Sequence, residues 1–194
     1  MKKIIQNSIL IFFSTLTLIS CSGDDLQNIN SADYNARMLD VFIYDSELVG
    51  EWEVDAMITD REIDLNGDGV SNYDLLSESS CFEKMVYTFR GDKTFTIINP
   101  ILELTNREDK DVFNCQSPTT ITGKWSIKDD SLILYIKRNN LEYQEKKHLI
   151  LLENHFYLEI NKNESKEFIN DKGNTSVSGL SVVALEFERT SKKF

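Results

Sequence analysis

The chain has 194 residues and carries 32 acidic against 21 basic residues, which gives a formal net charge of -11 at pH 7. This length fits one globular domain with an adequate hydrophobic core. A strongly acidic surface repels nucleic acid and anionic lipid headgroups, so the composition disfavours a nucleic-acid partner.

The first 20 residues have the pattern of a secretion signal. Lys2-Lys3 precede an apolar run at 9–19 that is too short to span a bilayer permanently. Residues 18–21, Leu-Ile-Ser-Cys, resemble the lipobox of bacterial lipoproteins, in which the cysteine thiol accepts diacylglycerol. We therefore expect a signal peptide at 1–20 and a lipid anchor on Cys21 that holds an extracytoplasmic protein at the outer membrane. The alternative is an ordinary leader with an incidental cysteine.

The next segment, 21–39, is polar and lacks any apolar periodicity, so we expect a flexible, acidic tether there. Its start, Ser22-Gly23-Asp24-Asp25, resembles the export signals that send some Gram-negative lipoproteins to the outer leaflet. Any polar tether would look similar, so the leaflet stays open. The folded domain is expected at 40–194.

Three cysteines are present, and lipidation of Cys21 would leave Cys81 and Cys115 as an even pair in an oxidising compartment. We expect one disulfide between them. Closure of this loop of 34 positions should stabilise the fold by about 3–4 kcal/mol. Metal binding by the pair is the less favoured alternative, because there is no second cysteine pair and neither His148 nor His155 lies at a finger-like spacing.

Beyond residue 40 the apolar residues recur with a period of two, which is typical of half-buried strands. In the first strand this alternation places Trp52, Val54, Ala56 and Ile58 on one face. Further strands, joined mostly by short turns, are expected near 85–89, 95–97, 125–127, 131–138, 143–152, 155–161 and 183–189. The segment 161–179 is polar and punctuated by glycine, so we expect a loop there.

About eight strands, with no helix long enough for a crossover, indicate an all-β fold: an antiparallel up-and-down meander. Closure into a small eight-stranded barrel would remove the exposed strand edges. Pro100 and Pro118 are expected near strand ends, where a missing backbone donor is tolerated.

Gly50-Glu51-Trp52 resembles the G-x-W motif of lipocalins, whose tryptophan plugs the closed end of an eight-stranded barrel. Arg189 resembles the lipocalin arginine that stacks over that tryptophan, which implies that Trp52 and Arg189 close the barrel. Over roughly 48–190 the chain is similar to lipocalin-like lipoproteins of Gram-negative bacteria. The motifs that carry this similarity are 64–69, Asp74-Leu75-Leu76, Cys81, Cys115 and Gly123-Lys124-Trp125.

The resemblance implies a small lipocalin-like barrel, an extracytoplasmic location and a single disulfide. The chain departs from such relatives at Phe82-Glu83-Lys84-Met85, where acidic residues are usual. It also carries a longer insertion between Pro100 and Cys115 than the family implies, so the loop geometry there is open.

Asp64-x-Asn66-x-Asp68-Gly69 matches the opening of an EF-hand-type calcium loop, with oxygen ligands at positions one, three and five and glycine at six. The pattern fails at position twelve, because Leu75 stands there. The candidate ligands of a structural Ca²⁺ are Asp64, Asn66, Asp68, Val70, Asn72 and Asp74. The alternative is a plain turn, because Asn-Gly and Asp-Gly are strong turn dipeptides.

Motifs of common catalytic sites are missing from the sequence. There is no G-x-S-x-G elbow, no H-E-x-x-H and no phosphate-cradling glycine loop. The sequence therefore predicts a protein that is not an enzyme, with no cofactor other than the candidate Ca²⁺.

Two functions remain open at this point. The leading hypothesis is that the barrel binds a small apolar ligand, because eight strands leave an interior that can hold one small molecule. The candidate lining residues are Met85, Tyr87, Phe89, Phe95, Leu134 and Phe187. The alternative is a solid barrel that serves as a structural or interaction module with an envelope protein as its partner.

Overall fold

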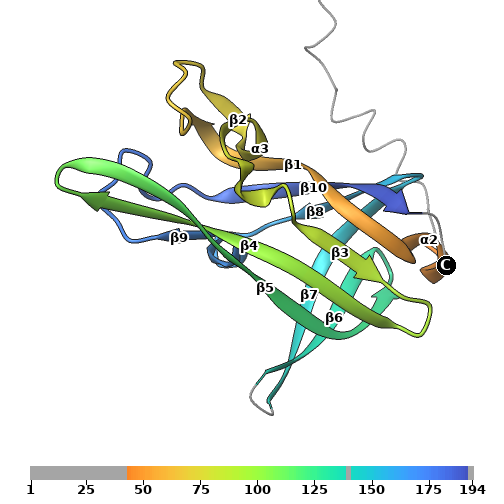
Figure 1. Cartoon of the computed structure of the whole chain (residues 1–194). Helices are drawn as coiled ribbons and strands as arrows, with labels where there is room; N and C mark the ends of the chain where they lie inside the picture. Colours follow the sequence, from red (N-terminus) through yellow and green to blue (C-terminus); the bar gives the residue numbers. More distant parts are fainter. Residues whose placement is uncertain (1–42, 139–140, 192–194) are drawn as a thin grey trace, which may run out of the picture. The chain divides into compact units, whose positions relative to one another are not determined.

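Eight strands follow one another along the chain and pair in nearly the same order in the computed structural model (Figure 1). The structure describes residues 43–138 and 141–191. The expected signal peptide and tether therefore lie outside the described residues. The eight strands are β1 (Gly50–Ile63), β3 (Val86–Phe89), β4 (Thr94–Arg107), β5 (Lys110–Lys128), β6 (Ser131–Arg138), β7 (Leu141–Leu152), β8 (His155–Glu159) and β10 (Val182–Ser191).

Each of these strands is antiparallel to its neighbours, and β10 also pairs with β1. In this last pair Trp52 stands opposite Arg189, and Val54 stands opposite Phe187. The pairing closes the sheet and so satisfies backbone groups that an open sheet would leave unpaired. The structure thus confirms the predicted all-β, up-and-down, eight-stranded barrel.

Within residues 43–138 and 141–191, two short strands and four short helical turns are added to the barrel. β2 (Asn72–Asp74) pairs with β1, and β9 (Ile169–Asp171) pairs in parallel with β4. The helical turns are α2 (Asp45–Leu48), α3 (Leu75–Glu78) and the 3-10 turns η1 (Ser80–Phe82) and η2 (Glu164–Glu167). Among the described residues, no helix is long and apolar enough to cross a membrane.

An up-and-down order places alternate connections at opposite ends of a barrel, and here the two ends differ. One end carries short turns at 90–93, 129–130 and 153–154, and we call it the turn end. Lys93, Asp129 and Glu153 have positive φ in these turns, as the sharp reversals require. The opposite end carries the long connections 64–85 and 160–181, and we call it the loop end.

The first strand departs from the predicted alternation at a β-bulge. Val54 stands opposite Phe187 and Ala56 opposite Glu186, so Asp55 is the extra residue. The bulge changes the phase of the strand, and beyond it Met57 and Thr59 are buried. The prediction that Ala56 and Ile58 share the face of Trp52 and Val54 is therefore wrong.

The expected insertion between Pro100 and Cys115 forms the far half of the β4–β5 hairpin. Pro100 and Pro118 lie within strands, not near their ends as predicted. They meet at an irregularity, because Asn99 pairs with Thr119 whereas Ile101 pairs with Gln116. A bulge tolerates residues that lack a backbone N–H, which explains how both prolines fit inside the hairpin.

The segment 161–179, which we expected to be a loop, contains η2 and β9. Phe168 and Ile169 of this segment are buried in the core. The backbone N–H of Leu102 in β4 donates to the carbonyl of Phe168 (2.9 Å). The segment therefore packs against the barrel at its loop end.

Candidate functional site

Cys81 and Cys115 form a disulfide, as predicted. Cys81 lies in η1 and Cys115 in β5, so the bond ties the long β1–β3 connection to the β4–β5 hairpin. Cys21, the predicted lipidation site, lies outside the described residues.

Trp52 is fully buried at the turn end, and Arg189 covers it. The guanidinium carbon of Arg189 lies 4.0 Å from the centroid of the indole. The same guanidinium donates hydrogen bonds to the carbonyl oxygens of Val49 (2.7 Å) and Glu47. Burial lowers the pKa of Arg189 from its usual value, and the nearby charge of Glu47 opposes this effect. The arginine thus fastens the last strand to the segment before the first.

A second cation–π pair, which we did not predict, lies at the same end. The ammonium of Lys93 lies 4.1 Å from the centroid of Trp125. The indole N–H of Trp125 lies 3.2 Å from the carbonyl oxygen of Arg90 and 3.1 Å from that of Thr94. Both tryptophans of the chain therefore lie at the turn end.

Arg189→Ala is expected to lower the free energy of unfolding by about 2 kcal/mol, because the cation–π contact and two hydrogen bonds to carbonyls are lost. Arg189→Lys keeps the positive charge but not the paired N–H donors of the guanidinium, so it should lower the free energy of unfolding by less than Arg189→Ala does. Urea unfolding of both variants measures these losses. Glu188→Ala, an exposed position on the same strand, is the control, and an alanine variant as stable as the wild type would contradict the closure role.

The six side chains predicted to line a ligand cavity belong to the packed core. Met85, Tyr87, Phe89, Phe95, Leu134 and Phe187 are each 3% exposed or less. Ring centroids lie 4.5 Å apart for Tyr87–Phe187, 4.5 Å for Phe156–Phe187, 4.9 Å for Trp52–Phe156 and 5.6 Å for Phe89–Trp125. Rings from five strands therefore meet in the interior, and a ligand among them would have to displace packed side chains.

In the predicted calcium loop, side-chain oxygens accept hydrogen bonds from backbone amides of the loop itself. Asp64 accepts from Gly67 (2.7 Å) and Gly69 (3.0 Å), and Asn66 accepts from Asp68 (2.9 Å). Asp68 accepts from the amide of Val70 (2.8 Å), whose side chain is exposed. These bonds are those of a tight turn.

Two further carboxylates accept hydrogen bonds beside this loop, and one of them, Asp74, is a predicted calcium ligand. Asp74 caps α3, where it accepts from the amide of Leu76 (3.1 Å), and it also accepts from the amide of Met57 (2.9 Å). Glu78, which the sequence did not single out, is only 4% exposed and accepts from the side-chain amide of Asn72 (2.5 Å) and the backbone amide of Leu65 (3.0 Å). The carboxylate of Glu78 therefore holds the two ends of the loop together through Leu65 and Asn72.

The calcium hypothesis predicts a rise in melting temperature. At a Ca²⁺ concentration ten times the dissociation constant the stabilisation is about 1.4 kcal/mol, or about 4 °C for a domain of this size. Asp64→Ala combined with Asp68→Ala should remove this increment. Mg²⁺ at equal ionic strength is the control. Identical melting curves in calcium and in chelator would leave only the turn.

An ion cluster around a buried lysine lies inside the barrel, and its two carboxylates are partly exposed. Lys147 of β7 pairs with Leu132 of β6 and so shares its inward face, where it is 4% exposed. Its ammonium lies 3.1 Å from a carboxylate oxygen of Glu164 and 3.7 Å from one of Glu145. Burial raises the pKa of Tyr87, and the charges of Glu167, Glu145 and Glu164 raise it further, so this phenol stays neutral. The cluster thus anchors η2 to the barrel wall.

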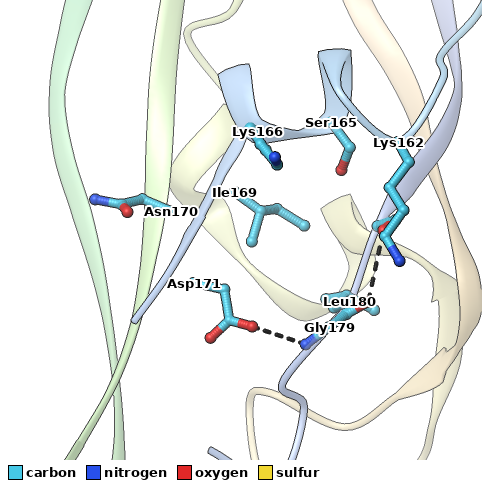
Figure 2. A pocket seen from close by; sticks show the side chains of 9 residues that line it. Lys162, Ser165, Lys166, Ile169, Asn170, Asp171, Gly179 and Leu180 are labelled. Atoms are coloured by element: carbon cyan, nitrogen blue, oxygen red, sulfur yellow. Dashed lines mark hydrogen bonds between the residues drawn. The ribbon is translucent and has the colours of Figure 1, made fainter. Parts of the chain in front are cut away.

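A hollow of about 330 Å³ lies beside η2 and β9 at the loop end (Figure 2). Ile169 and Leu180, both buried, form its apolar part. The remaining side chains that line it are Lys162, Ser165, Lys166, Asn170, Asp171 and Ser181, together with Gly179. Its volume falls at the lower end of the range for small-molecule sites.

Sequence reasoning missed both the ion cluster inside the barrel and the hollow at the loop end. The alternation of β7 puts Lys147 on the same face as Leu149, so the inward lysine could have been found from the period of two. The hollow has no such signal, because its residues come from the connection that holds Lys162, from η2, from the three-residue strand β9 and from the approach to β10.

Comparison with known proteins identifies a family. No curated protein and no solved structure matches the chain. A family model described as a domain of unknown function, DUF5004, matches residues 25–157. This match covers more than half of the chain and includes the barrel from β1 to the first residues of β8. The chain therefore belongs to the DUF5004 family.

Proposed function

We propose that this protein is a membrane-anchored, lipocalin-like lipoprotein of the outer membrane that binds a small apolar ligand with an anionic group. The leader and Cys21 support the anchor. The closed eight-stranded barrel and the stacking of Arg189 on Trp52 support the likeness to lipocalins. The proposed activity is binding and not catalysis, and the binding site is the hollow at the loop end.

The hollow carries this proposal because its charge is opposite to that of the chain as a whole. Lys162 and Lys166 border it, although the net charge of the protein is -11. The carboxylate of Asp171 accepts hydrogen bonds from the amides of Gly173 (2.8 Å) and Gly179 (2.7 Å) and is therefore engaged by its own loop. An apolar ligand with a carboxylate would meet both lysines and the two buried apolar side chains.

The walls of the hollow are fixed by contacts to the barrel. The hydroxyl of Ser165 accepts from the amide of Val182 (2.8 Å), and the side chain of Asn99 donates to the carbonyl of Glu167 (2.9 Å). β9 pairs with β4, and Glu164 contacts Lys147. A site whose walls are already ordered loses little conformational entropy when a ligand binds.

The test is to titrate the protein with decanoate and, as a matched uncharged ligand, with decanol. Decanoate is expected to raise the melting temperature in proportion to the logarithm of its concentration, and decanol should do so more weakly. Lys162→Glu combined with Lys166→Glu should weaken decanoate binding about tenfold, because two exposed charge contacts are reversed. Lys124→Glu combined with Lys128→Glu, at exposed positions on β5, is the control.

Tryptophan fluorescence separates this site from the barrel centre. Trp52 and Trp125 lie at the turn end, so a ligand in the hollow should stabilise the protein without quenching their emission. Quenching together with stabilisation would place the ligand among the core rings and contradict the proposed site. Stabilisation that is equal in the wild type and the Lys162/Lys166 variant would also contradict it.

A second candidate function, a solid barrel used as an interaction module, is favoured by the packed rings and by exposed apolar side chains on β7. Leu141 and Tyr143 share the face of Lys147 but lie where β7 begins at the loop end, and there they are 60% and 47% exposed. Apolar side chains that share an exposed face are typical of protein contacts. The test is to place a photo-cross-linking side chain at position 143 and to look for a cross-linked envelope protein in intact cells. If this surface binds such a protein, Leu141→Asp should abolish the cross-link.

A further inference from the structure

Asp55, His155 and Glu186 lie together on the outer face of the barrel, at the seam where the first and last strands pair. They come from β1, β8 and β10, which are adjacent in the sheet. One ligand atom from each residue can be chosen so that all three atoms lie within 4.8 Å of one another. These three residues are not among those that line the hollow.

The bulge in β1 explains why the carboxylate of Asp55 reaches this position. In an unbroken strand, residues 54 and 55 would point to opposite faces and residue 56 would point inward with residue 54. The extra residue breaks this alternation next to Glu186, which stands opposite Ala56. Bulges re-aim side chains and are over-represented next to functional sites.

His155 presents an imidazole nitrogen to this group. Its Nδ1 atom is shielded from solvent and has no hydrogen-bond partner among the described residues. It lies 3.2 Å from Oε1 of Glu186. The hydroxyl of Tyr157 donates to the same oxygen (2.7 Å) and so orients the carboxylate from its other side. Such outer hydrogen bonds commonly fix the carboxylate ligands of metal sites.

One nitrogen and two carboxylate oxygens form the ligand set that suits zinc and related first-row ions, whereas Ca²⁺ and Mg²⁺ prefer oxygen alone. In a tetrahedral zinc site, ligand atoms lie about 3.4 Å apart. The separation of His155 from Glu186 already matches this value, and rotation of the exposed side chain of Asp55 can complete the triangle. We propose that Asp55, His155 and Glu186 form a binding site for a divalent transition metal ion.

The site would hold the ion with three protein ligands and leave a fourth position for water, because the side chain of Asp55 is exposed to solvent. A metal bound here would join three strands across the closure of the barrel. The competing explanation is a histidine–glutamate ion pair with no metal. The two explanations make different predictions. A metal site should bind added zinc and should need Asp55, whereas an ion pair of His155 with Glu186 should do neither.

The experiment is isothermal titration of the untagged full-length protein with ZnCl₂, with Co²⁺ absorption as a check on coordination. One Zn²⁺ should bind per chain. His155→Ala and, separately, Asp55→Asn should each weaken binding at least tenfold, and Tyr157→Phe should weaken it by about tenfold. Asp55→Asn alters one atom of an exposed side chain, so it tests the site even if the histidine variant folds poorly.

His148 supplies the matched control. Its two ring nitrogens each face a different carboxylate, Asp130 at 3.3 Å and Glu159 at 3.9 Å, so the three groups do not converge on one ion. His148→Ala should bind zinc like the wild type, and so should the Asp64→Ala/Asp68→Ala variant. Absence of zinc binding by the wild type would overturn the proposal. Unchanged binding by both the His155 and Asp55 variants would also overturn it.

Discussion

Reduction of the disulfide between Cys81 and Cys115 is expected to lower the melting temperature by about 10 °C. The bond closes a loop of 34 positions, and loop-closure entropy gives it a stabilisation of about 3–4 kcal/mol. For a domain of this size each kcal/mol corresponds to about 2–4 °C. Calorimetry with and without reductant measures the shift.

Cys81→Ser combined with Cys115→Ser is the control for this experiment. The double variant should melt at the temperature of the reduced wild type, and reductant should have no further effect on it. Thiol labelling of native protein should modify neither cysteine until reductant is added. Labelled thiols in oxidised, native material would show that the bond does not form in solution.

Cys21→Ala is expected to release the protein from membranes entirely while its melting temperature stays unchanged. The acyl chains on Cys21 supply the proposed anchoring, and buried methylene groups contribute about 0.8 kcal/mol each. Among the described residues, the hydrophobic core runs from Leu48 to Phe187. Cell fractionation followed by a carbonate wash measures the release.

Labelling with a palmitate analogue gives an independent readout of the same prediction. The wild-type protein should incorporate the label and the Cys21→Ala variant should not. Retention of the unlabelled variant in washed membranes would contradict the lipoprotein hypothesis.

The period-two pattern predicted the barrel well, because strands of an antiparallel sheet alternate between core and solvent. Met85, Tyr87, Phe89 and Phe95 all point inward as the pattern required. The short turns expected between the strands are present as well, and Asp129 and Glu153 lie in two of them. These features depend on neighbouring residues alone, and a single sequence carries that information.

Features that depend on residues far apart in the sequence were not predictable in this way. The bulge at Asp55 arises from pairing with β10, more than a hundred residues later, and nothing in the first strand marks it. β9 forms only because the edge of β4 is available to it. The hollow could not be predicted for the same reason, because residues of η2 and residues just before β10 both line it.

The sequence also could not predict whether side chains fill the interior of the barrel. The sequence placed the six predicted lining residues on the correct face. The ring centroids of Tyr87 and Phe187, however, lie 4.5 Å apart, so these side chains pack against each other. We therefore place the proposed ligand site in the hollow at the loop end. Alternation tells which way a side chain points, but the remaining volume depends on how side chains from opposite strands meet.

Native mass spectrometry of the protein purified from the envelope of its own cells tests the binding proposal most directly. We expect one bound small molecule with an acidic group on the wild-type chain, and we expect it to be lost or strongly reduced in the Lys162→Glu/Lys166→Glu variant. The Lys124→Glu/Lys128→Glu variant should keep it. An unliganded mass for the wild type, or the same bound molecule on both lysine variants, would contradict a ligand site in the hollow.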